Sequence, residues 1–266
     1  MKTTDAPQQA AARSHTVQIN NIELHYEEYG DGTPLVLLHG FGGCAQNWHP
    51  FTTDLSKRHR LIAVDLRGHG YSTNPDKTFT HRAAASDVFL LLERLKVDQF
   101  SAMGMSSGGM VLLHMATSQP KRIDSMVLIS ATSHFPDQAR AIMRRASFVA
   151  MPRHVQDMYR HCAKRGDAQI HELISQFNAL GDNYDDMDFT AQRLSSISAR
   201  TLVVHGDRDQ FFPVEIAVSM YRSIPNAELW IIPGGDHVPI YDSEVPFSSA
   251  ALRFLDQHVG KQQSLF

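Results

Sequence analysis

The sequence predicts an α/β fold: a mostly parallel, eight-stranded sheet with helices on both faces and an inserted helical cap. Three observations support this prediction. Short apolar runs end in glycine or polar residues, as expected for strands buried on both faces of a parallel sheet. Segments with helical spacing lie between most of these runs. One long interval, 131–199, shows helical patches and no convincing strand pattern.

The first strands are predicted as an antiparallel hairpin. Apolar residues alternate along Val17–Glu28, which reads VQINNIELHYEE, and an Asn-Asn pair stands in its middle. The preceding residues, 1–16, lack the apolar core of a signal peptide. We therefore expect a flexible tail over 1–16.

The remaining strands and the core helices follow along the chain. Strands are predicted at Pro34–Gly40, Arg60–Gly70, Phe100–Met105, Ser125–Ser130, Arg200–Asp207 and Glu228–Gly234. Helices are predicted at Asp87–Leu95, Gly108–Thr117, Val214–Tyr221 and Phe247–His258. These elements assign residues 17–130 and 200–266 to one α/β core.

The interval 131–199 is predicted to form a helical cap over the carboxyl edge of the sheet, where open α/β sheets bind ligands. It is rich in Met and Phe, and we expect most of these side chains to form helix core and a few to line a substrate pocket. The candidate substrate-binding residues in the whole chain are Met105, Met143, Phe148, Phe212 and Val238.

Composition and charge exclude several classes of protein. The chain has 266 residues, of which 42% are hydrophobic and 20% charged, and its formal net charge is −3. This charge and the lack of a Lys/Arg-rich block argue against nucleic-acid binding. The phosphate-binding patterns G-x-G-x-x-G and G-x-x-x-x-G-K-[ST] do not follow any predicted strand. The histidines form no H-E-x-x-H motif, so we expect no metal and no cofactor.

The two cysteines, Cys44 and Cys162, are too few for a disulfide framework. We interpret both as free thiols in a reducing compartment. No apolar run is long enough to span a bilayer. The expected location is therefore the cytoplasm.

The turn between a predicted strand and a predicted helix carries the first chemical signal. Gly104–Gly108 fits the pattern G-x-S-x-G with Ser106 at its centre, whereas centring on Ser107 would place Met105 at the first glycine position. Such a turn holds a serine in a strained backbone conformation above the sheet. Ser106 is therefore the candidate nucleophile.

A glycine-rich loop, His39–Gly43, follows another buried strand and could stabilise the oxyanion that forms on an attacked carbonyl. The Ser107 amide would supply one hydrogen-bond donor, and the Phe41 amide the second, with Gly42 as the alternative donor. We expect His39 to be buried and to support this loop.

The base and its carboxylate are predicted after the last two strands. Asp209 is favoured to orient the histidine, with Asp207 as the alternative and a turn hydrogen bond for the residue not used. His237 lies in a glycine-rich loop and completes the chain order Ser…Asp…His. Its neighbour Asp236 is assigned to the surface.

Together, HGFGG, DLRGHGYS (Asp65–Ser72), GMSSGG, GDRD, GGDH and EVP (Glu244–Pro246) resemble the motifs of the α/β-hydrolase family in their order along the chain. The resemblance covers the chain from Val17 onward and implies a serine-nucleophile, carboxylesterase-like member with a helical cap. Serine-dependent members include carboxylesterases, lactonases, carbon–carbon bond hydrolases and cofactor-free perhydrolases. The carbon–carbon hydrolases usually have Asn before the nucleophile, where this sequence has Met105. Ser107 stands where Met or Gln is common in the family.

These observations predict a serine esterase that cleaves small to medium apolar carboxylic esters through an acyl-enzyme. The alternatives are a lactonase, a carbon–carbon hydrolase or a perhydrolase with the same triad, and a non-catalytic ligand receptor on the same fold. The expected partner is a small-molecule ester, without nucleic acid or membrane, and the expected state is a monomer or homodimer.

Overall fold

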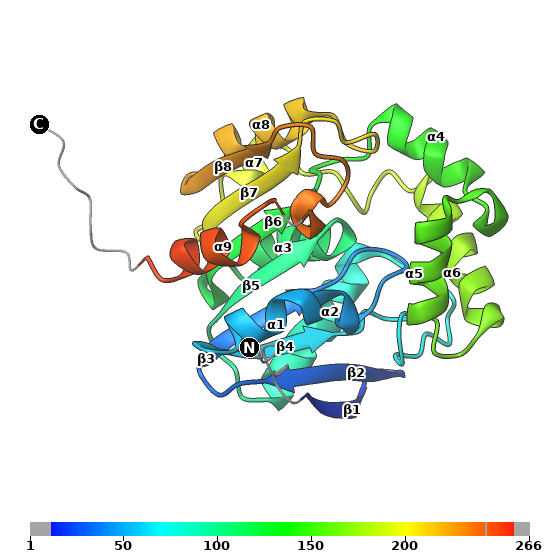
Figure 1. Cartoon of the computed structure of the whole chain (residues 1–266), viewed down its shortest axis with the longest axis horizontal. Helices are drawn as coiled ribbons and strands as arrows, with labels where there is room; N and C mark the ends of the chain where they lie inside the picture. Colours follow the sequence, from blue (N-terminus) through cyan, green and yellow to red (C-terminus); the bar gives the residue numbers. More distant parts are fainter. Residues whose placement is uncertain (1–11, 243, 258–266) are drawn as a thin grey trace, which may run out of the picture.

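The computed structural model describes residues 12–242 and 244–257. Its centre is one eight-stranded sheet with the strand order β1-β2-β4-β3-β5-β6-β7-β8 (Figure 1). The first two strands are antiparallel to their neighbours, and the other strands run parallel. The predicted α/β class and the mostly parallel eight-stranded sheet are confirmed.

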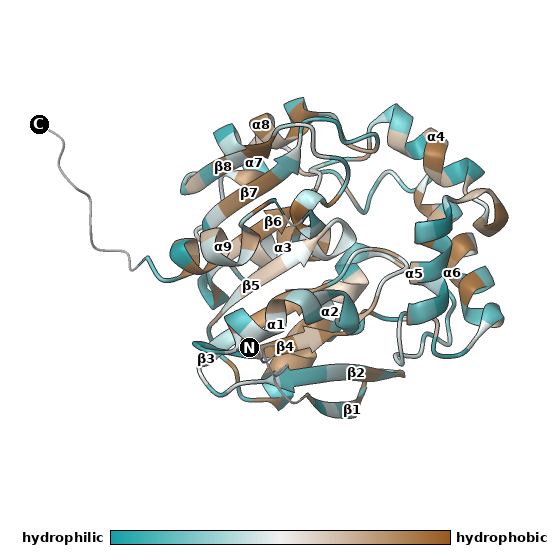
Figure 2. Cartoon of the chain, viewed as in Figure 1, coloured by the Kyte–Doolittle hydropathy of each residue, from teal (hydrophilic) through white to brown (hydrophobic). Residues whose placement is uncertain are grey.

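The strands follow the apolar runs of the sequence. Their bounds are β1 Arg13–Ile19, β2 Ile22–Tyr29, β3 Thr33–Leu38, β4 His59–Val64, β5 Phe100–Met105, β6 Ile123–Ile129, β7 Arg200–Gly206 and β8 Ala227–Ile232. Figure 2 shows hydrophobic residues concentrated on the central strands, whereas β1 at the edge is more hydrophilic. This difference follows from position, because central strands are covered on both faces and an edge strand is not.

Helices cover both faces of the sheet. Their bounds are α1 His49–Leu55, α2 His81–Arg94, α3 Ser107–Ser118, α4 Asp137–Arg145, α5 Arg153–Cys162, α6 Asp167–Leu180, α7 Ala191–Leu194, α8 Val214–Ser223 and α9 Phe247–Leu255. Short 3₁₀ helices occupy Ala45–Trp48, Pro120–Arg122, Phe148–Ala150 and Pro239–Tyr241. Side chains of α2, α3 and α8 share one apolar core with the sheet, and those of α1 and α9 share the other.

The amino-terminal boundary differs from the sequence prediction. The predicted tail covers residues 1–16. Residues 1–11 lie outside the described residues, and β1 begins at Arg13 rather than at Val17. His15 pairs with Tyr26 and stacks on its ring at 5.0 Å, and Thr16 pairs with His25. Cross-strand pairing therefore extends the hairpin into residues whose own sequence shows no apolar alternation.

The interval 131–199 contains α4, α5, α6 and α7 and, among its described residues, only an isolated β-bridge between His134 and Asp188. In Figure 1, α4, α5 and α6 stand beside the ends at which the parallel strands finish. Its treatment as a separate cap domain stays a prediction. Within the described ranges, no helix combines the length and the apolar character that a membrane span requires.

Candidate active site

Ser106 occupies the sharp turn between β5 and α3. Its φ of 49° lies in the left-handed region, and its N–H donates to the Ile129 carbonyl at 2.7 Å, which ties the turn to β6. Glycine is required on both sides, because a Cβ on Gly104 would lie 2.5 Å from the Gly108 backbone and one on Gly108 would lie 2.3 Å from the Leu38 oxygen. The sequence pattern therefore has a direct steric cause.

The structure brings Ser106, His237 and Asp209 together from three separate segments of the chain. His237 Nε2 lies 3.0 Å from Ser106 Oγ, and His237 Nδ1 lies 2.7 Å from Asp209 Oδ2. The Asp209 side chain is fully buried, whereas the His237 side chain keeps 24% of its surface exposed. These contacts have the geometry of a nucleophile, a base and an orienting carboxylate.

The environment of Asp209 fixes the tautomer of His237. Oδ1 of Asp209 accepts hydrogen bonds from the amides of Phe211 and Phe212 at 2.8 and 3.1 Å. Burial opposes ionisation of Asp209, but its hydrogen bonds from His237 and from these amides outweigh burial and lower its pKa. An ionised Asp209 can only accept, so His237 Nδ1 donates. Nε2 is then free to accept the Ser106 proton.

Neighbouring polar groups hold the segments that carry the base and the carboxylate. The Val238 amide, next to His237, donates to the hydroxyl of buried Ser130 at 3.1 Å. His205 is fully buried and donates through Nε2 to the Phe212 carbonyl at 2.9 Å. Asp207 accepts the Gly234 amide at 2.6 Å, so its carboxylate joins the loop after β7 to the loop after β8, 27 residues away, instead of making the local turn hydrogen bond that was predicted.

The loop after β3 lies against the nucleophile. A Cβ placed on Gly40 would lie 3.4 Å from Cβ of Ser106. His39 is buried as expected, donates through Nδ1 to the Gly40 carbonyl at 2.7 Å and accepts the Leu66 amide on Nε2 at 3.0 Å. Among the described residues, the amides of Phe41 and Ser107 donate to no acceptor. Both amides therefore remain available to a ligand, and their role in an oxyanion hole stays a prediction.

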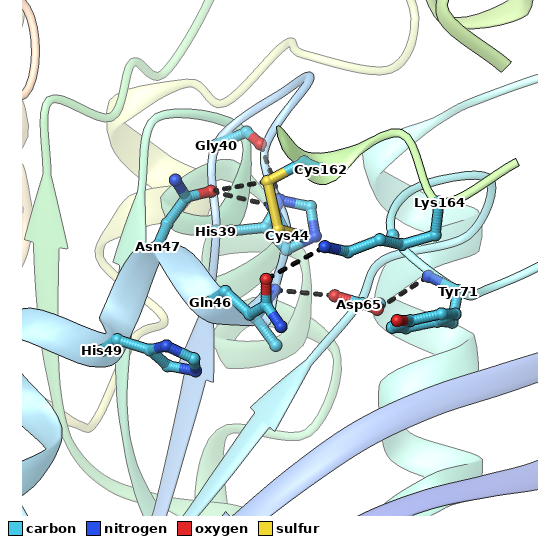
Figure 3. The surroundings of a disulfide bond; sticks show 12 residues. His39, Gly40, Cys44, Gln46, Asn47, His49, Asp65, Tyr71, Cys162 and Lys164 are labelled. Carbon is cyan, nitrogen blue, oxygen red and sulfur yellow. Dashed lines mark hydrogen bonds between the residues drawn. A yellow bond between two sulfur atoms is a disulfide. The ribbon is translucent and has the colours of Figure 1, made fainter. Parts of the chain in front are cut away.

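Cys44 and Cys162 form a disulfide, and the prediction of two free thiols is wrong. The bond joins the loop after β3 to the end of α5, and the two Cα atoms lie 5.4 Å apart although 118 residues separate them in sequence (Figure 3). A count of two cysteines permits one pair, and only the fold brings these two together. The assignment to a reducing compartment depended on free thiols, so the disulfide removes its support.

Other contacts hold the same loop against the sheet and against α5. The Ala45 amide donates to Asp65 Oδ1 at 2.6 Å, and the Tyr71 amide donates to Asp65 Oδ2 at 2.9 Å (Figure 3). Asp65 therefore joins the loop after β3 to the turn after β4. Tyr159 of α5 covers Gly42 so closely that a Cβ there would lie 2.2 Å from its ring, which leaves room only for glycine.

The candidate substrate-binding residues have different surroundings. Phe212 lies with its ring centroid 5.5 Å from that of His237, and Val238 is half-buried beside the same histidine. Met105 is buried in the core with α1 and α9, and Met143 is buried between α4 and the neighbouring helices. Phe148 packs on Tyr159, with the Arg160 guanidinium 5.1 Å above its ring. Of these five candidates, only Phe212 and Val238 therefore lie directly beside the candidate base.

Ser130 and His205 support the site and were not predicted from the sequence. Ser130 ends an apolar run at the carboxyl edge of the sheet, which is the only signal that pointed to the site. His205 lies in the quoted stretch HGDRD, but its contact with the Phe212 carbonyl depends on the conformation of the following turn.

The chain is similar to known proteins in sequence and in structure. The family model described as alpha/beta hydrolase fold matches residues 33–244. The chain belongs to the α/β-hydrolase family. This α/β hydrolase is 28% identical over 240 residues to serine hydrolase BPHL of Mus musculus, covering 85% of this chain and 81% of the relative. It is 25% identical over 273 residues to 2-hydroxymuconate semialdehyde hydrolase of Pseudomonas sp. strain CF600, covering 94% and 96%.

A solved structure of a bacterial membrane phospholipase A superposes on this α/β hydrolase with a TM-score of 0.77. The identity is 26%, and the match covers 92% of this chain and 86% of the other. These similarities place the chain among hydrolases with several different substrates. The reaction catalysed by this member therefore has to be argued from its own site.

Proposed function

We propose that this α/β hydrolase is a serine esterase that cleaves carboxylic esters of small to medium apolar substrates through an acyl-enzyme. The contact of His237 with both Ser106 and Asp209 carries this proposal. In the first step, His237 Nε2 takes the Ser106 proton while Oγ attacks the ester carbonyl. The amides of Phe41 and Ser107 would stabilise the resulting oxyanion.

The second half of the reaction uses the same groups. His237 returns the proton to the leaving alcohol, and the acyl group remains on Ser106. Water then attacks the acyl-enzyme with His237 as base, which releases the acid and restores Ser106. The aromatic rings of Phe212 and Phe211, whose centroids lie 5.5 and 5.0 Å from that of His237, favour an apolar substrate beside the base.

A second candidate is hydrolysis of a carbon–carbon bond. The similarity to 2-hydroxymuconate semialdehyde hydrolase, over nearly the full length of both chains, favours it. Met105 argues against it, because that class usually has Asn before the nucleophile. In addition, the Met105 side chain is buried in the core, where Tyr241 donates to its sulfur at 3.2 Å, and it presents no polar group to a substrate.

Turnover of p-nitrophenyl esters of increasing chain length, with lactones and a meta-cleavage product measured in parallel, tests the proposal. We expect measurable kcat/KM on the shorter esters and none after Ser106→Ala. Ser101→Ala is the matched control, because it removes a hydroxyl that pairs with Ser125 in the strand before the turn. Equal ester turnover by Ser106→Ala and the native chain would contradict the proposal.

A further inference from the structure

A second Ser–His–Asp arrangement begins at the residue after the candidate nucleophile. Ser107 Oγ lies 3.1 Å from His81 Nε2, and His81 Nδ1 lies 2.6 Å from Asp186 Oδ2. The corresponding distances in the first arrangement are 3.0 and 2.7 Å. This set is more deeply buried than the first: the His81 side chain is 0% exposed, and Ser107 and Asp186 are 4% and 3% exposed.

Hydrogen bonds to Asp186 orient the His81 ring and place a proton on its Nδ1. Asp186 also accepts the amides of His81 and Arg82, at 2.7 and 3.1 Å. Burial alone would raise the pKa of Asp186, but the hydrogen bonds from His81 and the two amides outweigh it and lower the pKa to about 2. An ionised Asp186 requires His81 Nδ1 to donate, so in the neutral ring Nε2 accepts and the Ser107 hydroxyl donates.

The Ser107 oxygen can therefore accept a further hydrogen bond but cannot donate one. Its single proton is committed to His81, and its lone pairs find no donor among the described side chains. Covering this oxygen with an apolar group would leave a buried acceptor unsatisfied, which is unfavourable. A ligand group that donates a hydrogen bond would satisfy it.

The surroundings of Ser107 are aromatic. An arc of rings leads from the loop after β3, past His81, to the candidate base, and Ser107 contacts the arc at His81. The centroid distances are 5.2 Å for Phe41–Phe79, 5.2 Å for Phe79–His81, 5.9 Å for His81–Phe135, 6.4 Å for Phe135–Phe212 and 5.5 Å for Phe212–His237. The Ser107 oxygen thus lies against a largely aromatic set of side chains, at the residue that follows Ser106.

We propose that the Ser107 hydroxyl determines specificity by accepting a hydrogen bond from a hydroxyl on the acyl part of the substrate. This inference rests on the proposed esterase function and narrows the substrate class to esters of short hydroxy acids. His81 and Asp186 act as positioning residues, since they hold the Ser107 proton away from the substrate. A donor on the substrate is favoured, and an acyl chain without one is disfavoured.

The test compares kcat/KM for methyl 2-hydroxybutyrate, methyl 3-hydroxybutyrate and methyl butyrate, followed by proton release. We expect the native chain to prefer one of the hydroxylated esters by about tenfold. Ser107→Ala should bring that ratio close to one, and Ser107→Thr, which keeps the hydroxyl, should retain most of it. His81→Asn keeps an N–H donor for Asp186 but removes the acceptor for Ser107, so it should also lose the preference.

Ser101→Ala is the matched control, because Ser101 lies near the start of β5, where its hydroxyl pairs with Ser125 of β6, and the ratio should not change. The same ratio in the native chain and Ser107→Ala, or an equal loss on all three esters, would overturn the inference and make Ser107 a purely structural residue. Failure of the esterase proposal would look different: the native chain would hydrolyse none of the esters, and a phosphonate would not label Ser106.

Discussion

Nδ1 of His237 lies 2.7 Å from Oδ2 of Asp209, across a sequence separation of 28 residues. The neighbouring carboxylate, Asp207, accepts the Gly234 amide. We predict that Asp209→Asn lowers kcat on a p-nitrophenyl ester by about 10⁴-fold, because an amide no longer holds the required tautomer of the imidazole. Asp207→Asn should lower kcat by less than about tenfold, since the asparagine oxygen can still accept the Gly234 amide and the side chain does not hold the histidine. Comparable losses in the two variants would refute this assignment.

Ser130 should act on the reaction through the loop that carries the base. Its hydroxyl accepts the amide of Val238, whose φ is 57°. We predict that Ser130→Ala lowers kcat about tenfold with little change in KM, because His237 loses its positioning and the substrate loses no contact. Ser125→Ala removes a buried hydroxyl from β6, the strand that Ser130 follows; among the described residues this hydroxyl pairs with Ser101, and the variant should leave both constants near their native values. If Ser130→Ala changed neither constant, the positioning role would be excluded.

The disulfide should contribute strongly to stability. It closes a loop between residues 118 apart, and the chain-entropy model assigns about 5 kcal/mol to a loop of this length. We predict that the double variant Cys44→Ser/Cys162→Ser loses a similar amount in free energy of unfolding, measured by denaturant titration. A dithiol reductant should destabilise the native chain and leave the double variant unchanged. Two reactive thiols in the unreduced, unfolded native chain would contradict the disulfide.

Buried histidines should make folding sensitive to acid. Burial lowers the pKa of His69 from 6.5 to about 3 and that of His114 to about 4, and it also lowers the pKa of His39 and His205. The unfolded chain therefore binds more protons than the folded chain between pH 6.5 and these lower values. Stability is fully present above pH 6.5 and should fall below it, by about 1.4 kcal/mol per pH unit for each such histidine.

His69→Phe tests this pH dependence at one site. Nε2 of His69 has no hydrogen-bond partner among the described residues, and the ring packs against those of Phe41 and Phe79 at 4.8 and 5.6 Å. We predict that the variant folds and that its free energy of unfolding falls less steeply between pH 6.5 and 4. The slope should decrease by the amount that the uptake of about one proton contributes. Denaturant titrations at several pH values measure this slope. An unchanged slope would show that another group is responsible.

The sequence predicted the sheet and the position of Ser106 because both depend on local constraints. Apolar runs mark strands buried on both faces, and the close approach at Gly104 and Gly108 allows only glycine. The contacts that the sequence did not predict are long-range. His81 meets Asp186 across 105 residues and Cys44 meets Cys162 across 118, so no local pattern indicates either pair. The sequence also placed the start of β1 at Val17 instead of Arg13. The first residues of β1 pair with β2 but show no apolar alternation of their own.

Covalent labelling with a fluorophosphonate, followed by intact-mass analysis and peptide mapping, tests most directly whether Ser106 is the nucleophile. Two adjacent serines, Ser106 and Ser107, each contact a histidine, and only His237 is partly open to solvent. We predict one adduct per chain on Ser106. The adduct should be absent in Ser106→Ala, and its formation should be much slower in His237→Ala. An adduct on Ser107, or no adduct in the folded protein, would contradict this prediction.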